Sequence, residues 1–341
     1  MGADSTHDGF SFQRDGFFFD AHGAPCMLVG SVEFRTFWNT LDTLFETPLG
    51  RKLIYAATDG EEYLPNQHPT FGFGRLFGKK RVKNLLEERW HSMGWGKHMD
   101  HTIASPVHDA FVVGIALAHA EHLRRERLEL NWRQLSVDEI RVDYDNKKSP
   151  MMSGVPAPPR PRSSALTTST EECFSLGLDH RNIGFFSGQE RSFFLPTHVL
   201  QYLAKELRGR KMLQSPDLLF SPPDDENGAD GFFAMANAVA HAFSQTEFPV
   251  YLRHSGDWQG LLDDRIAQRG WGRAALLESI MDNNEFTSFR IESSFPALPT
   301  GLLAAMWFRG HGERPRIRVE FEDEFVVLHL QKMTVHYLVK T

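Results

Sequence analysis

The chain contains two copies of one segment, and this repeat constrains its fold more than any other feature. The segment from residue 85 to 97 reads LLEERWHSMGWGK, and the segment from 261 to 273 reads LLDDRIAQRGWGR. The offset is 176 throughout, without a gap, and both copies place a Trp between two glycines. Because chance rarely preserves such a pattern, the sequence predicts an internal duplication.

The likeness continues on both sides with different offsets, as expected for an old duplication that has gained loop insertions. Upstream, LDTLFETPLGRKLI from Leu41 pairs with LQYLAKELRGRKML from Leu200, and both contain a Gly-Arg-Lys triplet. Downstream, FVVGIALA around Gly114 pairs with LPTGLLAA around Gly301. Each copy then ends in two segments of alternating apolar and polar residues, which predicts a β-hairpin.

The order of the predicted elements is the same in both copies. Each has two helices, a GWG turn, a strand near Ile103 or Ile291, a small-residue helix and the closing hairpin. This order predicts an α+β fold in which helices pack on a small antiparallel sheet. We expect the two duplicated repeats to form a pseudo-dimer, because a duplicated unit tends to retain the two-fold contact of a homodimeric ancestor. The predicted boundaries are 16–146 for the first repeat, 147–179 for a Pro/Ser-rich linker and 180–338 for the second repeat.

Composition excludes several classes of protein. The 37 Lys and Arg against 44 Asp and Glu leave a net charge of −7, which argues against a nucleic-acid binder that works through bulk charge. The longest apolar run, FVVGIALA, is far shorter than the roughly 18 residues of a membrane span, and the N-terminus has no secretory pattern. With only Cys26 and Cys173, a disulfide framework is excluded, so a cytoplasmic location is expected.

The repeat resembles a known domain. A helix ending in GWG, a strand, a small-residue helix of the form F-x-x-G and a hairpin are similar to the vinyl-reductase-type ligand-binding domain and its relatives among the TRAPP transport subunits. The resemblance covers roughly 80–150 and, more clearly, 256–330, which contains FRIESSFPALPTGLLAAMWF. It implies a small apolar or amphipathic ligand between the helices and the sheet, dimerisation through helices, and bacterial regulators as relatives. The chain lacks the cysteines that many bacterial members carry on the closing hairpin.

The small-residue helices indicate where a ligand would bind. We expect each of them to face its closing hairpin, where small side chains leave room that either holds a guest or lets the backbones approach closely. The second repeat keeps the family pattern better, and Trp271 is placed at the mouth of its pocket. An indole in such a turn is nonetheless more often an anchor to the core. The predicted ligand-binding residues are Trp271, Phe295, Gly301, Ala304 and Met306, with Trp95 and Gly114 as their counterparts in the first repeat.

A second hypothesis is a metal- or haem-dependent enzyme or sensor that uses the His-rich first repeat. His98 and His101 follow the GWG turn, and His119 and His122 end the small-residue helix. Imidazoles three residues apart share a helix face and can bind zinc together with a carboxylate. Favourable cations at the C-terminal end of a helix are the structural explanation of the same pattern.

Arg89 and Arg265 recur at equivalent positions of the two copies. Such an Arg can bind a carboxylate or phosphate, but we favour ion pairs with the acids that precede them in the helix, or with the opposite repeat. Those acids are Glu87 and Glu88 in the first copy and Asp263 and Asp264 in the second.

No motif identifies catalysis or a cofactor, since the chain has no GxSxG elbow and FGFGRLFGKKR lacks the ending of a phosphate loop. The sequence therefore favours a non-enzymatic small-molecule-binding, regulatory or scaffold protein, and its cofactor is unknown. A third hypothesis is a structural subunit of a larger assembly or homo-oligomer that uses the Phe-rich segments GFFFD and FGFGRLF as protein contacts.

Overall fold

The computed structural model describes residues 9–72, 78–150, 176–181, 183–187, 189–221, 230–280 and 285–333. Most of the predicted linker, residues 151–175, lies outside this set, as do residues 73–77 of the Phe-rich segment and residues 334–338 of the predicted second repeat. Within the described residues the chain forms eight α-helices and three antiparallel sheets, so the predicted α+β class is confirmed.

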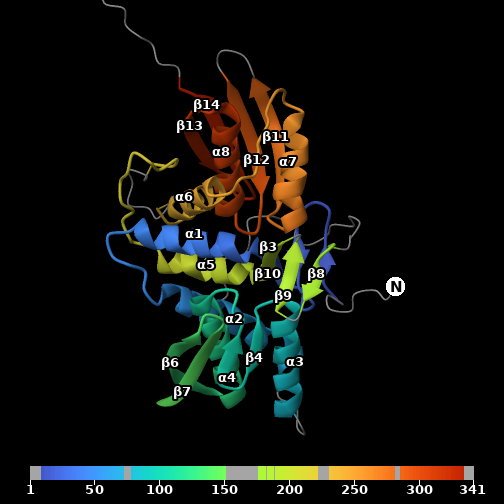
Figure 1. Cartoon of the computed structure of the whole chain (residues 1–341), viewed down its shortest axis with the longest axis vertical. Coiled ribbons are helices and arrows are strands. Elements are labelled where there is room, and N and C mark those ends of the chain that lie inside the picture. The colour runs from blue at the N-terminus through green and yellow to red at the C-terminus, as the bar shows by residue number, and fades with distance from the viewer. Residues whose placement is uncertain are drawn as a thin grey trace, which may run out of the picture.

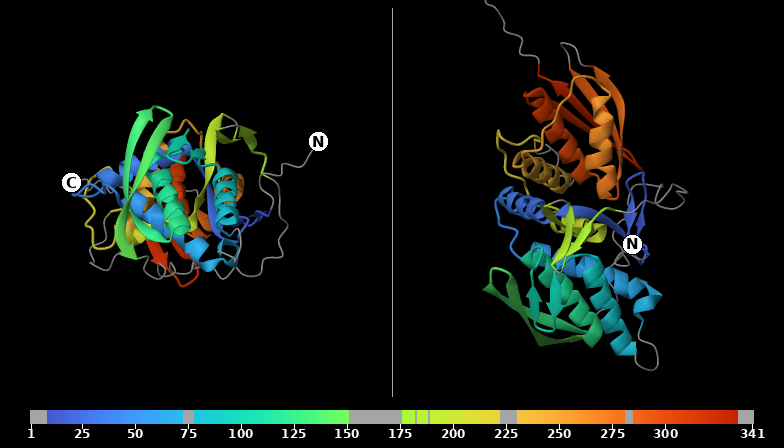
Figure 2. Two further views of the ribbon diagram at one scale, coloured as in Figure 1. Left: turned by 90° about the horizontal axis from the view of Figure 1, so that it is seen from below. Right: turned by 45° about the vertical axis from the view of Figure 1, so that its right-hand side comes forward.

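The molecule is elongated, with one lobe at each end of its long axis and a central layer between them (Figure 1). A view turned by 45° shows the same three tiers (Figure 2). The central layer holds a six-stranded sheet in the order β1-β2-β3-β10-β9-β8. Its strands are β1 (Ser11–Phe12), β2 (Phe18–Phe19), β3 (Pro25–Gly30), β8 (Asp179–Arg181), β9 (Gly184–Ser187) and β10 (Glu190–Pro196).

The lower lobe in Figure 1 is built from the first half of the chain. Its helices are α2 (Lys52–Gln67), α3 (Gly78–Ser92) and α4 (Asp109–Arg124), with the 3-10 turn η2 (Pro69–Phe71) between α2 and α3. Its strands are β4 (Lys97–Met99), β5 (Thr102–Ala104), β6 (Glu126–Ser136) and β7 (Glu139–Pro150), in the order β4-β5-β7-β6. Helix α3 buries Val82, Leu86 and Trp90 at intervals of four residues, which is the spacing of one helix face.

The upper lobe repeats this order with the second half of the chain. Its helices are α6 (Asp230–Ser244), α7 (Asp257–Arg265) and α8 (Ala297–His311), with η4 (Ala267–Arg269) after α7. Its strands are β11 (Arg273–Ile280), β12 (Phe286–Glu292), β13 (Pro315–Phe321) and β14 (Val326–Lys332), in the order β11-β12-β14-β13. Every residue of α8 from Ala297 to Trp307 is buried, as its uniformly apolar sequence requires.

The GWG motifs are turns that only glycine can make cheaply. Gly94 and Gly96 have φ angles of +76° and +113°, and Gly270 and Gly272 have +70° and +109°. Side chains rarely adopt such angles, which explains why both glycines recur in both copies. The Trp between them points inward, since Trp95 and Trp271 are 0% and 1% exposed.

The two halves of the chain exchange contacts across the central layer. Helix α1 (Ser31–Thr43) of the first half packs on α6 of the second, and α5 (Thr197–Glu206) of the second packs on α2 of the first. The Trp95 indole donates to the carbonyl of Phe194 at 2.9 Å, and the Trp271 indole donates to the carbonyl of Leu28 at 3.0 Å. Leu28 and Phe194 face each other in the β3–β10 pairing, so the two hydrogen bonds are reciprocal.

Candidate functional site

The small-residue helices do not leave the room that was predicted. A Cβ on Gly301 would lie 2.2 Å from the carbonyl oxygen of Ala236 in α6, and one on Gly114 would lie 2.4 Å from that of Ile54 in α2. Both glycines therefore face a neighbouring helix, although the helices that carry them also contact strands of the closing hairpins, as expected. Their lack of a side chain lets two backbones touch, and no guest fits at either position.

The other predicted ligand-binding residues of the second repeat belong to the packed core. Ala304 and Met306 are fully buried, and Phe295 is 9% exposed. None of these three residues lines the cavity or either of the grooves described below. Trp271 is the exception, since it does line the cavity. Trp95 lines none of the three spaces described below, and its indole donates a hydrogen bond to Phe194.

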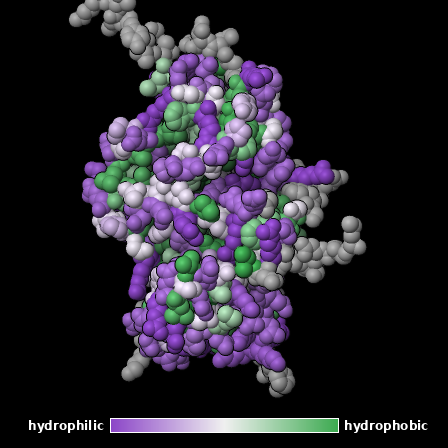
Figure 3. Space-filling model, in the orientation of Figure 1, coloured by the Kyte–Doolittle hydropathy of each residue, from purple (hydrophilic) through white to green (hydrophobic). Residues whose placement is uncertain are grey.

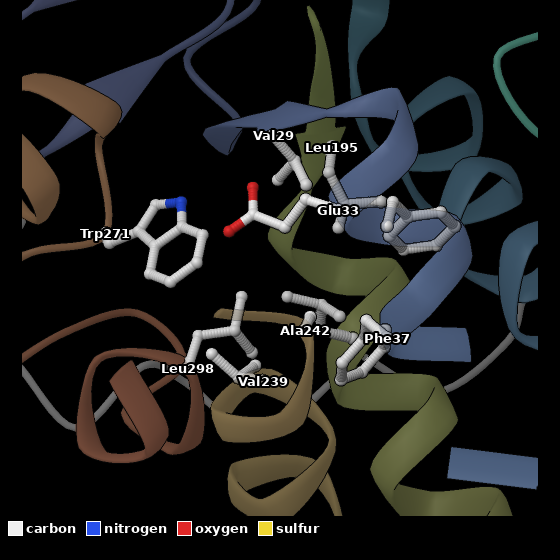
Figure 4. A pocket seen from close by; sticks show the side chains of 10 residues that line it. Val29, Glu33, Phe37, Leu195, Val239, Ala242, Trp271 and Leu298 are labelled. Carbon is white, nitrogen blue, oxygen red and sulfur yellow. The ribbon is translucent and has the colours of Figure 1, made fainter. Parts of the chain in front are cut away.

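The cavity at Trp271 lies where α1 meets α6, between the two halves of the chain. Figure 4 shows the Glu33 carboxylate pointing across it toward the indole, with Leu298 and Val239 on one side and Val29 on the other. Its volume is about 20 Å³, which is room for one water-sized guest. Arg269 pairs with Glu33 and lies 4.1 Å from the centre of the Trp271 ring, so an ion pair covers one end. The full lining is Val29, Glu33, Phe34, Phe37, Leu195, Leu200, Val239, Ala242, Trp271 and Leu298.

The matching contact between α2 and α5 is closed. A Cβ on Gly60 of α2 would lie 2.8 Å from the Cα of Val199 in α5. Gly60 follows Ile54 by six residues, just as Ala242 follows Ala236, and Ala242 lines the cavity. A methyl group in the contact with the cavity thus occupies the position that a glycine has in the closed contact. We conclude that the cavity is a packing difference between the halves rather than a ligand-sized site.

Val239→Ile is expected to stabilise the protein, because it adds one methylene to this cavity. The gain should be about 0.8 kcal/mol in the free energy of unfolding. Gly60→Ala is the matched control in the closed contact, and it should cost about 1–3 kcal/mol through overpacking. Urea unfolding gives the change in unfolding free energy of each variant. Equal changes in the two variants would contradict the difference in packing between the open and the closed helix contact.

The structure does not assemble the predicted metal site. His98 stacks on Trp90, with ring centres 4.9 Å apart, and His101 contacts the Val142 carbonyl at 3.1 Å. His119 contacts the Glu61 carboxylate at 2.9 Å, and His122 contacts the Phe71 carbonyl at 3.2 Å. Each imidazole is thus oriented by a different part of the lobe. Among the residues that the structure describes, no three His, Cys, Asp or Glu side chains are grouped so that they could hold a metal ion.

A buried ionic cluster, which we define as Arg89, Asp20, Glu61 and His119, joins the lower lobe to the turn between β2 and β3 of the central sheet. The Arg89 guanidinium donates to both oxygens of Glu61, at 2.7 Å and 3.0 Å, and also pairs with Asp20. All four side chains are at most 5% exposed. Burial by itself would raise the pKa of Glu61, but Arg89 and the His119 hydrogen bond outweigh it and lower this pKa to about 2.

This cluster corrects the predicted ion pairs of Arg89. Glu87 and Glu88 are exposed on the opposite side of α3, and the partners of Arg89 come from α2 and from the turn before β3. The equivalent Arg265 lies over the Phe248 ring, 3.4 Å from its centre. The sequence did hold a signal for this burial, since Arg89 follows Val82 by seven residues and Leu86 by three, which places it on the apolar face.

Three histidines should make the stability of the protein fall on acidification. Burial is the largest cause that lowers the pKa values of His98, His108 and His198 to about 4, with nearby cationic groups adding to it. Between pH 6.5 and 4 the unfolded chain binds protons that the folded chain refuses, so stability is present above pH 6.5 and is lost as the pH falls. His98→Gln should reduce the slope of unfolding free energy in this window by about 1 kcal/mol per pH unit.

The measurement is urea unfolding at several pH values between 4 and 7. His254→Gln serves as the control, because the His254 side chain is 73% exposed. An unchanged slope in His98→Gln would contradict the assignment of a lowered pKa to His98.

Two grooves in the described residues are large enough for a small molecule. The first, of about 620 Å³, lies beside the GWG turn of the lower lobe and is lined by Glu87, Trp90, His91, Gly96, Lys97, His98, Ala104, Ser105 and Ile183. Its charged side chains, Glu87 and Lys97, are exposed to solvent.

The second groove, of about 420 Å³, lies on the upper lobe; we call it the β13 groove. It is lined by Leu218, Leu219, Phe220, Ser221, Phe233, Arg314, Pro315, Arg316, Ile317, Val319 and Met333. Asn237 of α6 holds one wall in place, since its amide accepts from the backbone N–H of Phe220 at 3.0 Å and donates to the Phe220 carbonyl at 2.8 Å. The face shown in Figure 3 is mostly hydrophilic, with small hydrophobic patches that include the area around α6 and β13.

No known family, no curated protein and no solved structure matches the chain. None of the described helices combines the length and apolar character needed to cross a bilayer.

Proposed function

We propose that the chain is a small-molecule-binding protein built from two duplicated, vinyl-reductase-like halves that form a pseudo-dimer. The duplication is supported by the repeated element order and by the identical strand order of the two terminal sheets. The pseudo-dimer is supported by the reciprocal hydrogen bonds of Trp95 and Trp271 around the Leu28–Phe194 pair. A duplicated unit that keeps its ancestral two-fold contact would have these features.

The β13 groove is the site that we assign to the ligand. The observation that carries this assignment is its lining, in which aliphatic and aromatic side chains from four separate segments form a groove of about 420 Å³ beside the closing hairpin of the second half. Small-molecule sites are concave, mostly apolar and roughly of this volume. The ligand is a small apolar or amphipathic molecule. The first half of the chain contributes by packing against the half that contains the groove.

Binding of octan-1-ol, a neutral amphipathic probe, tests the groove. Saturation-transfer NMR on the full chain should show octanol bound to the wild type, and Val319→Trp should weaken that binding at least tenfold by filling the groove. Val239→Ile, which changes the cavity at Trp271, is the matched control and should bind octanol like the wild type. Circular dichroism would verify that both variants fold. Equal binding by Val319→Trp and the wild type would place the ligand elsewhere.

A further inference from the structure

We infer that a second copy of this chain pairs with β6, so that two lower lobes share one continuous sheet. The inference goes beyond the proposed function and does not involve the β13 groove. In the order β4-β5-β7-β6, β6 is the last strand, and among the described residues it pairs only with β7. It lies at the outer side of the lower lobe (Figure 1). The backbone N–H and C=O groups on the open side of an edge strand can pair with another chain.

The regular part of β6 is centred on Asn131. Register shifts in its pairing with β7 fall between Glu126 and Leu128 and between Gln134 and Ser136, so the seven residues from Leu128 to Gln134 are uninterrupted. Asn131 is the middle residue of this stretch. A two-fold axis at Asn131 would therefore pair the whole stretch with its own copy in antiparallel register.

Such a pairing matches opposite charges. With the axis at Asn131, Glu129 of one copy would lie opposite Arg133 of the other, and the same pair would form again on the other side of the axis. All three side chains are exposed. On the other face of the strand, the buried Leu130 would lie opposite the half-buried Trp132. Opposite charges and apolar pairs across antiparallel strands stabilise a sheet.

The same charges are mismatched within the β6–β7 hairpin. Glu129 lies opposite Asp145 of β7, and Arg133 lies opposite Arg141. Arg141 has its own partner, since its Nε lies 3.1 Å from an oxygen of Asp143. Like charges directly across two strands destabilise a sheet. The charges of β6 therefore fit a second copy of β6 better than they fit the strand beside it.

The other edge strands that the structure describes are less suited to self-pairing. Strands β1, β4 and β8 have only two or three residues, and a register shift between Leu276 and Glu278 interrupts β11. Strand β13 has seven residues, but a two-fold axis at its centre would place Arg318 opposite Arg318 of the copy. Its first residue, Pro315, also has no N–H to donate. Strand β6 is thus the edge that fits a second copy of the chain.

Sedimentation equilibrium of the full chain tests the inference. The wild type should show a monomer–dimer equilibrium that weakens as salt is raised, because the paired charges lie at the surface. Arg133→Glu should weaken dimerisation at least tenfold, since it places two carboxylates opposite each other on both sides of the axis. Glu129→Arg should do the same with two guanidinium groups. Each variant replaces a like-charge pair with β7 by an opposite-charge pair, so the hairpin should remain folded.

A mixture of the two variants separates strand pairing from a general effect of charge. Arg133→Glu and Glu129→Arg in equal amounts should form a heterodimer with close to wild-type affinity, because all the facing charges are then opposite. Native mass spectrometry distinguishes this heterodimer from either homodimer by mass. Arg318→Glu on β13 is the matched control with the same change in net charge. Its side chain is 77% exposed, and this variant should dimerise within twofold of the wild type.

Three results would overturn the inference. The first is a wild type that stays monomeric up to its solubility limit at low salt. The second is a dimer that Arg133→Glu does not weaken, and the third is a mixture of the two variants that forms no heterodimer. Hydrogen exchange provides the location, since the amides between Leu128 and Gln134 should become more protected when the wild type dimerises.

Discussion

Arg89→Met is expected to lower the free energy of unfolding by about 3–5 kcal/mol. The variant leaves the carboxylates of Asp20 and Glu61 buried without their cation, and only His119 remains to pair with Glu61. Removing one partner of a buried ionic group costs far more than the pair itself contributes, because the remaining charge stays desolvated. Urea unfolding at pH 7 gives the value, with the slope against denaturant showing whether the unfolded state has changed.

Arg265→Met is the matched control for this experiment. Arg265 occupies the equivalent position of the second repeat, but it contacts the Phe248 ring in place of buried carboxylates. Its loss should cost about 1 kcal/mol, as for a cation–π contact at a partly exposed site. If Arg89→Met and Arg265→Met were equally destabilising, the buried ionic cluster would not carry the stability assigned to it. Glu61→Gln added to Arg89→Met should recover part of the loss, since it removes one of the two buried charges.

Gly301→Ala is expected to destabilise the protein by about 2–3 kcal/mol. The added methyl group would lie 2.2 Å from the Ala236 carbonyl oxygen, so α6 and α8 would have to move apart. This cost exceeds the gain of about 1 kcal/mol that alanine brings to a helix interior. Because backbone atoms form both sides of the contact, no rotation of a side chain can relieve it.

The control is Gly260→Ala in α7, where a Cβ would have no atom within 4 Å. Only the helix-propensity gain applies there, so this variant should be more stable than the wild type by about 0.5–1 kcal/mol. Thermal unfolding of the two variants in parallel separates the cost of the steric contact at Gly301 from the gain in helix propensity that both alanines bring. A stabilised Gly301→Ala would contradict the close approach of α6 and α8 and reopen the prediction of a guest at Gly301.

Local sequence patterns predicted most of the helices and strands of the two lobes. The helix before each GWG turn, the strand after it, the helix through Gly114 or Gly301 and the closing hairpin all occur where the periodicities indicated them. These elements depend on signals within a few residues of each other, such as the 3.6-residue spacing of Val82, Leu86 and Trp90. The six-stranded central sheet was missed, because β3 and β10 are short apolar runs that local pattern cannot distinguish from buried helix segments.

The candidate site was only partly predictable. Trp271 and Trp95 were expected either to bind a ligand or to anchor their turns, and each donates a hydrogen bond to a strand of the other half. Nothing in the sequence indicates the β13 groove, because it combines residues about 100 positions apart, from Leu218 to Val319.

The sequence by itself determined the α+β class, the repeated order of elements and the GWG turns, because each depends on residue spacing or on the left-handed angles that glycine alone adopts easily. Only the tertiary structure decided which residues meet. It paired Arg89 with Asp20 and Glu61 across three segments, placed Gly301 against α6 instead of the hairpin, and oriented His98, His101, His119 and His122 toward different partners. The physical reason is that packing and ion pairing act between segments far apart in the chain. The spacing of residues along the chain does not indicate which of those distant segments come into contact.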